Sequence, residues 1–183
     1  MRTLVITKSD LDSDNKYIGG ENLGTYSEPA ELNVEIAEGL GYVSFEKSVV
    51  VRGYIYSKAG SGIKAGYGIK AGWGIKAGEG IEAGEGIVSG LSISCKLSLS
   101  VALRIFAGVC WWREISDGEK EVTCGKLEKG EVAYGTLEEI GLPDKKPTGR
   151  RVKVKLDNGE IVGGELMEGK SSDSFFSDLL KDK

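Results

Sequence analysis

Residues 61–90 read SGIKAGYGIKAGWGIKAGEGIEAGEGIVSG, which is a six-residue unit Ile-x-Ala-Gly-x-Gly repeated with little variation. Isoleucine takes every sixth position and keeps this register through residue 93, at Ile63, Ile69, Ile75, Ile81, Ile87 and Ile93. A short, constant period is typical of a β-solenoid and not of a sandwich, a bundle or an α/β domain. The sequence therefore predicts an all-β fold, a hexapeptide-repeat β-solenoid (β-helix).

Each unit places two side chains inside the predicted coil. Because side chains alternate between the faces of a strand, isoleucine and the residue two positions later point to the same side. This second inward position is always small, at Ala65, Ala71, Ala77, Ala83, Ser89 and Cys95. We expect the glycines to supply the bends, since glycine accepts backbone angles that other residues resist. Three units then form one coil of about eighteen residues.

The same frame extends beyond the evident repeat. It runs forward through the inward pairs Ile93/Cys95, Leu99/Val101 and Ile105/Ala107 to Trp111, and one unit backward to Ser57/Ala59. Residues 57–110 then hold nine units, or about three coils. The stacked pairs that this spacing predicts are Lys64–Glu82, Tyr67–Glu85 and Trp73–Leu91. A flexible glycine-rich linker is the alternative interpretation, but a linker has no reason to keep isoleucine in register.

We divide the chain into four regions on this basis. Residues 1–56 contain a short strand and irregular apolar alternation, which predicts degenerate capping coils, because terminal repeats of a solenoid are atypical. Residues 57–110 form the hexapeptide repeat. Residues 111–142 alternate moderately and predict capping strands. Residues 143–183 form a basic β-hairpin with an amphipathic tail.

The hairpin and the tail are predicted from local patterns. Two alternating segments, Arg151–Leu156 and Ile161–Met167, flank Asn158-Gly159, and Asn-Gly is the strongest short signal for a hairpin turn. The segment Ser171–Leu180 forms a short helix with one apolar side, or an end that orders only on a partner.

The composition limits where the protein can be located and what its cysteines can do. No stretch is long and apolar enough to span a membrane, and the first ten residues lack the profile of a signal peptide. We therefore expect a protein of the cytoplasm. Cys95, Cys110 and Cys124 form no CxxC pair and are odd in number, so no disulfide framework is expected, and Cys95 is interpreted as a small core residue.

Charge alternates strongly along a chain whose net charge is −4. Residues 114–142 carry eight acidic and three basic side chains, whereas residues 143–156 carry one acidic and six basic side chains. Such blocks favour surfaces that meet partners of different sign. Ordinary solvated faces are the alternative.

The Ile-x-Ala-Gly-x-Gly run resembles the fold signature of the hexapeptide acyltransferases. Those enzymes rely on a histidine base, and the related carbonic anhydrases hold zinc with histidines, but this chain contains no histidine. It also lacks a Walker-type Gly-Lys-Ser/Thr motif, a Gly-x-Ser-x-Gly elbow and a cysteine cluster. We expect no catalytic residues, no metal and no cofactor.

One acidic turn matches the spacing of a calcium-binding EF-hand loop. Asp10, Asp12 and Asp14 alternate, and Glu21 follows Asp10 by eleven residues. Asn15 stands where the loop requires glycine, and no helices are predicted on either side. An acidic surface turn is the favoured interpretation.

Two sets of basic and aromatic residues are candidates for contact with a partner or a nucleic acid. The outward repeat positions carry Lys64, Lys70 and Lys76 interleaved with Tyr67 and Trp73. The predicted hairpin region carries the denser basic patch, at Lys145, Lys146, Arg150, Arg151, Lys153 and Lys155. In the strand, Arg151, Lys153 and Lys155 fall on one face by alternation.

Three stretches together go beyond the generic coil. They are the Ile-x-Ala-Gly run, Leu103–Gly108 running into Trp111-Trp112, and Cys124–Leu127 running to Val132–Gly135. The combination resembles small β-solenoid proteins encoded by phages and prophages of gut Firmicutes, and in particular anti-CRISPR proteins that inhibit Cas9.

This resemblance implies a non-catalytic inhibitor that binds a Cas9-type effector with its guide RNA. Acidic faces at Glu114–Glu139 would occupy a positively charged nucleic-acid channel, and the basic hairpin would touch RNA or DNA. Trp112 is the candidate aromatic anchor, with a buried cap as the alternative. Complex formation should depend strongly on salt.

Two other functions remain open. A structural role would use the open coil ends to form homo-oligomers, because exposed strand edges template association. A sponge for signalling nucleotides would use glycine-rich turns and lysines at subunit junctions, and would co-purify with a ligand that absorbs ultraviolet light.

Overall fold

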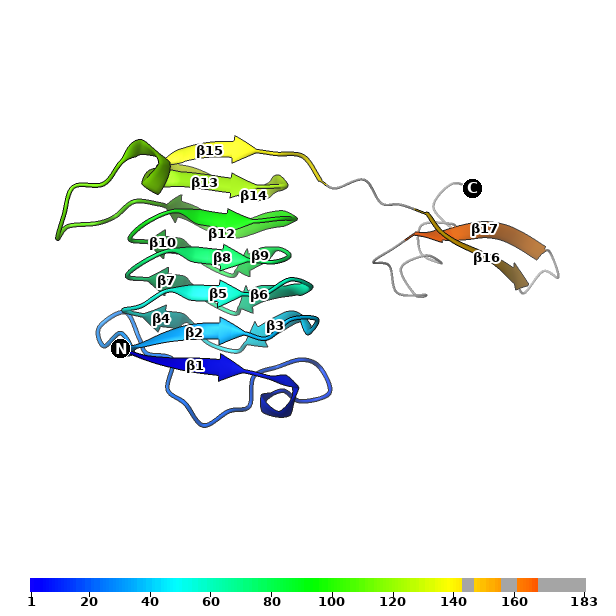
Figure 1. The fold of residues 1–183 in the computed structure, drawn as a ribbon, viewed down its shortest axis with the longest axis horizontal. Helices are drawn as coiled ribbons and strands as arrows, with labels where there is room; N and C mark the ends of the chain where they lie inside the picture. The colour runs from blue at the N-terminus through cyan, green and yellow to red at the C-terminus, as the bar shows by residue number, and fades with distance from the viewer. Residues whose placement is uncertain (143–146, 156–160, 168–183) are drawn as a thin grey trace. The chain divides into compact units, whose positions relative to one another are not determined.

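The structure is a computed structural model that describes residues 1–142, together with the backbone of residues 147–155 and 161–167. The chain divides into two compact units, Met1–Leu142 and Pro143–Lys183. The first unit is an all-β solenoid built from parallel strands stacked along one axis (Figure 1). The fold class predicted from the repeat is therefore confirmed.

The first face of the solenoid is a seven-stranded parallel sheet in the order β1-β2-β5-β8-β11-β13-β15. Its strands are β1 (Arg2–Ile6), β2 (Leu32–Ile36), β5 (Ile55–Ser57), β8 (Ile75–Ala77), β11 (Ile93–Cys95), β13 (Glu121–Cys124) and β15 (Thr136–Glu139). In Figure 1 these strands form the front of the stack.

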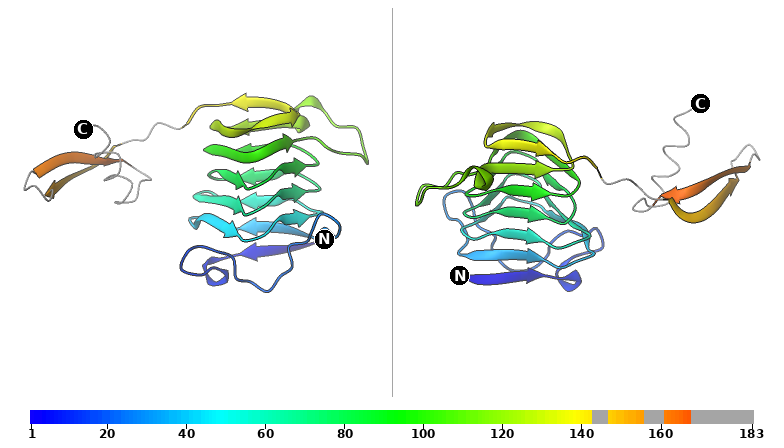
Figure 2. Two further views of the ribbon diagram at one scale, coloured as in Figure 1. Left: turned by 180° about the vertical axis from the view of Figure 1, so that it is seen from behind. Right: turned by 45° about the horizontal axis from the view of Figure 1, so that its top comes forward.

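The other two faces are joined through two long strands that turn a corner. The second face contains β3 (Gly41–Phe45), β6 (Ser61–Ala65) and β9 (Ile81–Ala83), and the third contains β4 (Val49–Val51), β7 (Ile69–Ala71) and β10 (Ile87–Ser89). The first part of β12 (Ser98–Phe106) pairs with β9, and its last two residues pair with β10. Above it, β14 (Lys126–Tyr134) follows β12 along both faces. Figure 2 shows the same stack from behind and from an oblique angle.

Register between coils follows the sequence period. Ile63 pairs with Ile81, and Ile69 pairs with Ile87, so the repeat advances one coil in eighteen residues. The predicted stacked pairs are confirmed. Lys64 Nζ lies 2.8 Å from a carboxylate oxygen of Glu82. The amide of Glu85 donates to the carbonyl of Tyr67 at 3.1 Å, and the amide of Leu91 donates to the carbonyl of Trp73 at 3.3 Å.

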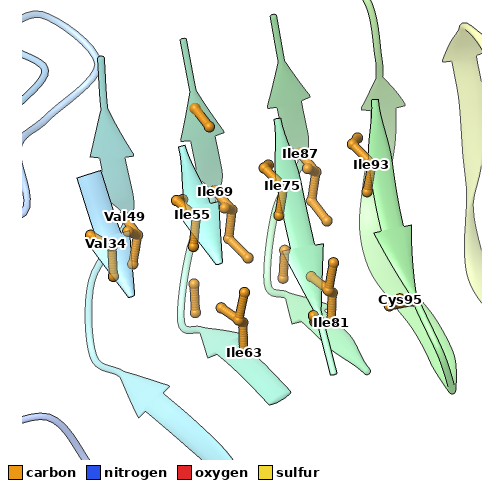
Figure 3. Packing of buried hydrophobic residues seen from close by; sticks show 14 of the residues in the cluster. Val34, Val49, Ile55, Ile63, Ile69, Ile75, Ile81, Ile87, Ile93 and Cys95 are labelled. Atoms are coloured by element: carbon orange, nitrogen blue, oxygen red, sulfur yellow. The ribbon is translucent and has the colours of Figure 1, made fainter. Parts of the chain in front are cut away.

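The interior is a column of aliphatic side chains. All six repeat isoleucines are at most 1% exposed, and the small partners Ala65 to Cys95 are at most 6% exposed. Figure 3 shows these isoleucines pointing inward from facing strands, with one layer for each coil. Each fully buried aliphatic side chain contributes about 1.5–3 kcal/mol, so the period is also the main source of stability.

The glycines of the repeat are required for close approach and not for unusual backbone angles. None of the glycines between residues 62 and 90 has a positive φ. Instead, a Cβ at Gly72 would collide with the carbonyl of Arg52, and a Cβ at Gly90 would collide with the carbonyl of Gly72, one coil away in each case. The glycines lie at the bends as expected, but our reason, unusual backbone angles, was wrong, because it is the close packing of the coils at the corners that excludes a side chain.

The backward extension of the repeat frame was also wrong by two residues. Ile55 pairs with Ile75, and Ser57 is fully buried at the second inward position, whereas Ala59 is exposed. The chain gains two residues at the corner after β5, where Gly60 has a φ of +69°. This insertion shifts the inward pair from Ser57/Ala59 to Ile55/Ser57.

The N-terminal end is closed by one degenerate coil, whereas the apolar alternation at residues 32–51, which we also expected to be irregular, forms the regular strands β2, β3 and β4. After β1, single bridges connect Lys16 to Ser44 on the second face and Ala30 to Val51 on the third. Leu11, before the first bridge, and Leu23, between the two, are 8% and 9% exposed. These irregular segments complete one turn of chain below the first regular coil.

The C-terminal end is formed by the last rung, Lys126–Glu139, which comprises β14 and β15. A loop at residues 108–120 interrupts the coil below it, so Ile93 pairs with Val122, twenty-nine residues later. This loop contains a short 3₁₀ helix, Asp117–Lys120, and projects sideways from the solenoid in Figure 2.

The second unit contains an antiparallel pair, β16 (Pro147–Lys155) and β17 (Ile161–Met167). The predicted strand pairing is confirmed, with Lys155 opposite Ile161. The turn at Asn158-Gly159 and the tail Ser171–Leu180 lie outside the described residues.

Candidate binding surfaces

The structure separates the lysines of the repeat. Lys64, Lys70 and Lys76 lie on β6, β7 and β8, which belong to three different faces. Lys64 is paired with Glu82, and the ammonium of Lys76 lies 5.9 Å from the centre of the Tyr56 ring. The repeat therefore offers no continuous basic stripe for a nucleic acid backbone.

The basic hairpin patch is only partly described. Lys145 and Lys146 lie outside the described residues, and Arg150, Arg151, Lys153 and Lys155 lie on β16, of which the backbone alone is described. Their role in nucleic-acid contact stays a prediction from sequence.

Trp111 is a second correction to the repeat frame. The period places this residue inward, but it is 87% exposed, because the chain leaves the coil after Ala107 and enters the lateral loop. The departure begins at Gly108, whose φ is +79°. The frame thus ends with the buried pair Ile105/Ala107.

All three tryptophans of the chain gather at one corner of the solenoid. Trp73 precedes β8 at the corner between the third and first faces and stacks below Leu91. The rings of Trp111 and Trp112 meet edge to face, with centroids 6.0 Å apart. The Trp112 ring lies against this corner, since a Cβ at Gly90 would sit 3.1 Å from its Cη2. We call Trp73, Leu91, Trp111 and Trp112 the tryptophan corner.

The tryptophan corner is exposed although it is rich in apolar surface. Trp73 is 52% exposed and Trp112 is 44% exposed. Trp112 is therefore neither a fully buried cap nor a free side chain, because one edge packs on the coil and the rest meets solvent. Large aromatic rings in this state are typical of protein contact surfaces.

Hydrogen bonds hold the lateral loop in place. The amide of Val109 donates to the carbonyl of Ser89 at 3.0 Å, where the loop leaves the coil. At its far side, Arg113 Nη1 donates to Glu119 at 3.1 Å, and the amide of Ser116 donates to the same carboxylate at 3.0 Å. The Arg113 hydrogen bond is the main reason that the pKa of Glu119 is lowered to about 2. The two loop tryptophans are thus presented by an ordered segment.

A hollow of about 380 Å³ lies on the outer side of the first face. Tyr54 Oη donates to Glu35 at 2.7 Å on one side, and Tyr56 and Lys76 form a ridge on the other. The hydrogen bond to Glu35 is the main cause that raises the pKa of Tyr54. The hollow combines aromatic rings with one acidic and one basic group.

The acidic turn near the N-terminus uses its carboxylates within the turn. Asp10 accepts hydrogen bonds from the amide and hydroxyl of Thr7, both at 2.8 Å, and these lower its pKa. Asp12 accepts from the amides of Asp14 and Lys16, both at 2.9 Å. Within the described part of the chain, no group of three metal-ligating side chains is found.

Two of the three thiols are inside the solenoid. Cys95 and Cys124 are buried at successive rungs of the first face, whereas Cys110 is half-buried in the lateral loop. Burial raises the pKa of Cys95 to about 12 and also raises the pKa of Cys124. Cys95 therefore fills the small inward position that the repeat predicts.

Comparisons with protein-family models, with curated proteins and with solved structures found no match to this chain. Among the residues that the structure describes, no helix has the length and apolar character needed to cross a membrane. The binding surfaces are therefore argued from their own geometry.

Sequence reasoning found Trp73 and Trp112 but missed that they share a corner. The lateral loop that joins them carries a visible signal. Ser116-Asp-Gly-Glu119 is a capping box, which marks the start of a helical turn inside what the frame treats as coil. The outer hollow has no comparable signal, because Glu35, Tyr54 and Lys76 come from three different coils.

Proposed function

We propose that this protein is a non-catalytic binding protein that holds a protein partner through the tryptophan corner. The observation that supports this proposal is the gathering of all three tryptophans, each at least 44% exposed, at one corner of a rigid stack. Tryptophan is the residue most enriched among interface hot spots, because its ring buries a large area at low entropic cost.

Charge around the tryptophan corner favours a basic partner surface. Glu114 is exposed in the lateral loop, where Glu119 pairs with Arg113 and Asp117 pairs with Lys120. On the last rung Glu128, Glu138 and Glu139 are exposed together with Lys126 and Lys129, and Glu131 pairs with Arg104 at 3.5 Å. A partner with an apolar pocket inside a positively charged channel would complement both properties.

The specific partner that we propose is a Cas9-type effector with its guide RNA. Two arguments support it: the resemblance of the three sequence stretches to Cas9-inhibiting anti-CRISPR proteins, and the acidic surface, which suits a nucleic-acid channel. In this mechanism the tryptophan corner anchors the protein while its carboxylates compete with DNA phosphates. The basic strand β16 is the proposed contact to guide RNA.

The test is cleavage of target DNA by the effector and guide RNA with this protein titrated in, together with gel filtration of the mixture. We expect inhibition, co-elution and weakening at high salt. Trp112→Ala and Trp73→Ala should each raise the inhibitory concentration about thirty-fold. Tyr67→Ala is the matched control, because Tyr67 is an equally exposed aromatic (53%) at a different corner.

The possible outcomes separate the two parts of the proposal. Absence of both inhibition and co-elution would contradict the Cas9-type partner. Inhibition that is reduced equally by Tyr67→Ala and Trp112→Ala would contradict the role of the tryptophan corner. Binding of guide RNA alone with the same affinity would move the main contact to the basic hairpin.

A further inference from the structure

The last rung leaves apolar side chains of the inner column uncovered. Leu127 stacks on Leu99, Val132 on Ile105 and Leu137 on Val122, so each continues an inward column of the core. The residues below them are fully buried, but Leu137 is 39% exposed and Leu127 and Val132 are half-buried. Among the described residues, no strand pairs with β14 or β15 from above.

The spacing of these three residues is symmetric. Val132 follows Leu127 by five residues, and Leu137 follows Val132 by five. A two-fold axis through Val132 therefore places Leu127 of one copy opposite Leu137 of the other, and Val132 opposite itself. The three apolar inward positions then meet one another, whereas Glu139, which lies above the inward Cys124, meets Gly125.

The helical rise of the coil selects the same axis. The coil rises by one strand spacing in each turn. The end of the last rung, at β15, is therefore one strand spacing higher than its beginning, at β14, and we call this difference in height the step. The C-terminal ends of two solenoids fit together without a gap only when the low beginning of the last rung in one copy faces the high end of the last rung in the other copy. Lys126 begins the rung and Glu138 lies near its end, so the axis through the middle, at Val132, satisfies this condition.

Charge agrees with this register. Antiparallel pairing about Val132 places Lys126 opposite Glu138 of the second copy, and the symmetry forms this pair twice. Both side chains are exposed, and neither takes part in an ion pair within the described part of one chain. Opposite charges directly across antiparallel strands are stabilising, and like charges are destabilising.

We propose that the last rung, Lys126–Glu139, is a homodimer interface in which two solenoids stack end to end about a two-fold axis at Val132. A second copy would continue the inner column and pair the free strand edges, which are otherwise templates for unspecific association. The dimer would carry two tryptophan corners, so a partner with two sites would bind with avidity. The dimer would cover the carboxylates of the last rung and leave the tryptophan corner and the lateral loop for the partner, and its formation is tested without that partner.

Glu139 sets a limit on the strength of this interface. Its carboxylate stacks over Cys124 and accepts a hydrogen bond from the amide of Leu127 at 2.6 Å, which satisfies one group of the free edge. In the proposed register each Glu139 lies opposite Gly125 of the second copy, so the interface would bury its charge at a cost in free energy. Glu139→Gln keeps an acceptor for Leu127 and should tighten the dimer.

The first test is sedimentation velocity of the full chain over a wide concentration range. We expect a monomer–dimer equilibrium. Lys126→Glu places like charges opposite each other twice and should weaken the dimer about tenfold or more, and the double variant Lys126→Glu/Glu138→Lys should restore it. Lys129→Glu is the matched control, because Lys129 lies on the same strand but opposite Gly135, and it should leave the equilibrium unchanged.

The second test is disulfide trapping at the axis. Val132→Cys should cross-link to itself under mild oxidation, since directly opposed residues have Cα atoms about 4.5–5.5 Å apart, within reach of a disulfide. Ala133→Cys and the native protein provide the baseline. A monomer at every concentration, equal effects of Lys126→Glu and Lys129→Glu, or no enrichment of the Val132→Cys product would overturn the proposal. In the first case another segment or protein covers this end.

Discussion

The two ends of the solenoid differ in how far the chain covers the apolar interior. At the N-terminal end, an irregular segment folds back over the core, and Leu11, Leu23 and Phe45 are all at most 9% exposed. At the C-terminal end, the last rung stays regular, and Leu137 is 39% exposed at the top of its column. The N-terminal end is therefore complete within one chain, whereas the C-terminal end has the properties of a surface that another molecule covers.

In this chain, the turn that caps the core is the one that departs from the regular pattern of the coils. A coil that repeats the pattern of the coil below it leaves its own edge available to the next coil. The N-terminal turn breaks the pattern on two of the three faces, with a 3₁₀ helix at Lys8–Asp10 and with single bridges, so β1 is the one regular edge that this end offers within the described residues.

The largest expected effect tests the energetic side of this comparison. Phe45→Ala should lower the free energy of unfolding by about 3 kcal/mol or more, because Phe45 is 4% exposed and packs against Tyr17 with ring centroids 5.6 Å apart. Leu137→Ala should cost less than about 1 kcal/mol in the monomer, because much of that side chain already meets solvent. Urea unfolding at low protein concentration measures both values. Similar losses at the two ends would contradict the comparison.

A smaller effect is expected at two buried serines near the N-terminal end. Ser61 Oγ donates to the carbonyl of Ala37 at 2.7 Å and accepts from the amide of Leu40 at 2.8 Å. Ser61→Ala leaves both groups unpaired and should cost about 1–3 kcal/mol. Ser57 is equally buried, but its hydroxyl has no hydrogen-bond partner within the described residues.

Ser57→Ala is therefore the matched control and should be neutral or stabilising. Alanine is the residue that the repeat uses one coil above, at Ala77, and it removes a hydroxyl that is buried without compensation. Thermal unfolding of both variants provides the measurement. Destabilisation by Ser57→Ala as large as that by Ser61→Ala would show that Ser57 has a polar role.

Much of this fold was predictable because one physical requirement repeats. The isoleucine at every sixth residue identifies the interior, and the pairs Lys64–Glu82 and Trp73–Leu91 follow from the period alone. The frame failed where the period changes, at the two-residue insertion after Ser57 and at the lateral loop that carries Trp111. An insertion at a corner leaves the inward pattern on both sides intact, so the pattern does not show where a residue was added.

The candidate site was less predictable than the fold. Trp73 was recognised as an outward candidate and Trp112 as either an anchor or a buried cap, but their meeting depends on the return of the lateral loop to the corner at Gly90. Side chains that come together through such a loop share no spacing in the sequence. The tryptophan corner therefore required the structure.

The buried thiols can report whether the C-terminal end of the solenoid opens locally. Because burial raises the pKa of Cys95 to about 12, its thiol is protonated and unreactive at pH 8. We expect an aromatic disulfide reagent to modify Cys110 first, then Cys124, which lies one rung from the open end, and Cys95 last. Mass spectrometry of partly labelled protein gives the order. Labelling of Cys95 and Cys124 at equal rates would indicate that the end does not open separately.

The smallest expected effect concerns the lateral loop just below the open end. The pKa of Glu119 is lowered to about 2 in the folded protein, chiefly by the hydrogen bond from Arg113. A carboxyl whose pKa is lowered by folding contributes stability above its unfolded pKa, near 4.5, and loses that contribution as pH falls toward 2. We therefore expect tryptophan fluorescence to change between about pH 4.5 and 2 while the strand content is retained. Glu119→Gln should remove this transition, and Glu114→Gln should keep it, because only the backbone oxygen of Glu114 contacts Arg113. If the transition survives in Glu119→Gln, the loop is held mainly by its backbone hydrogen bonds to the coil, and the tryptophan corner is then as rigid as the solenoid beneath it.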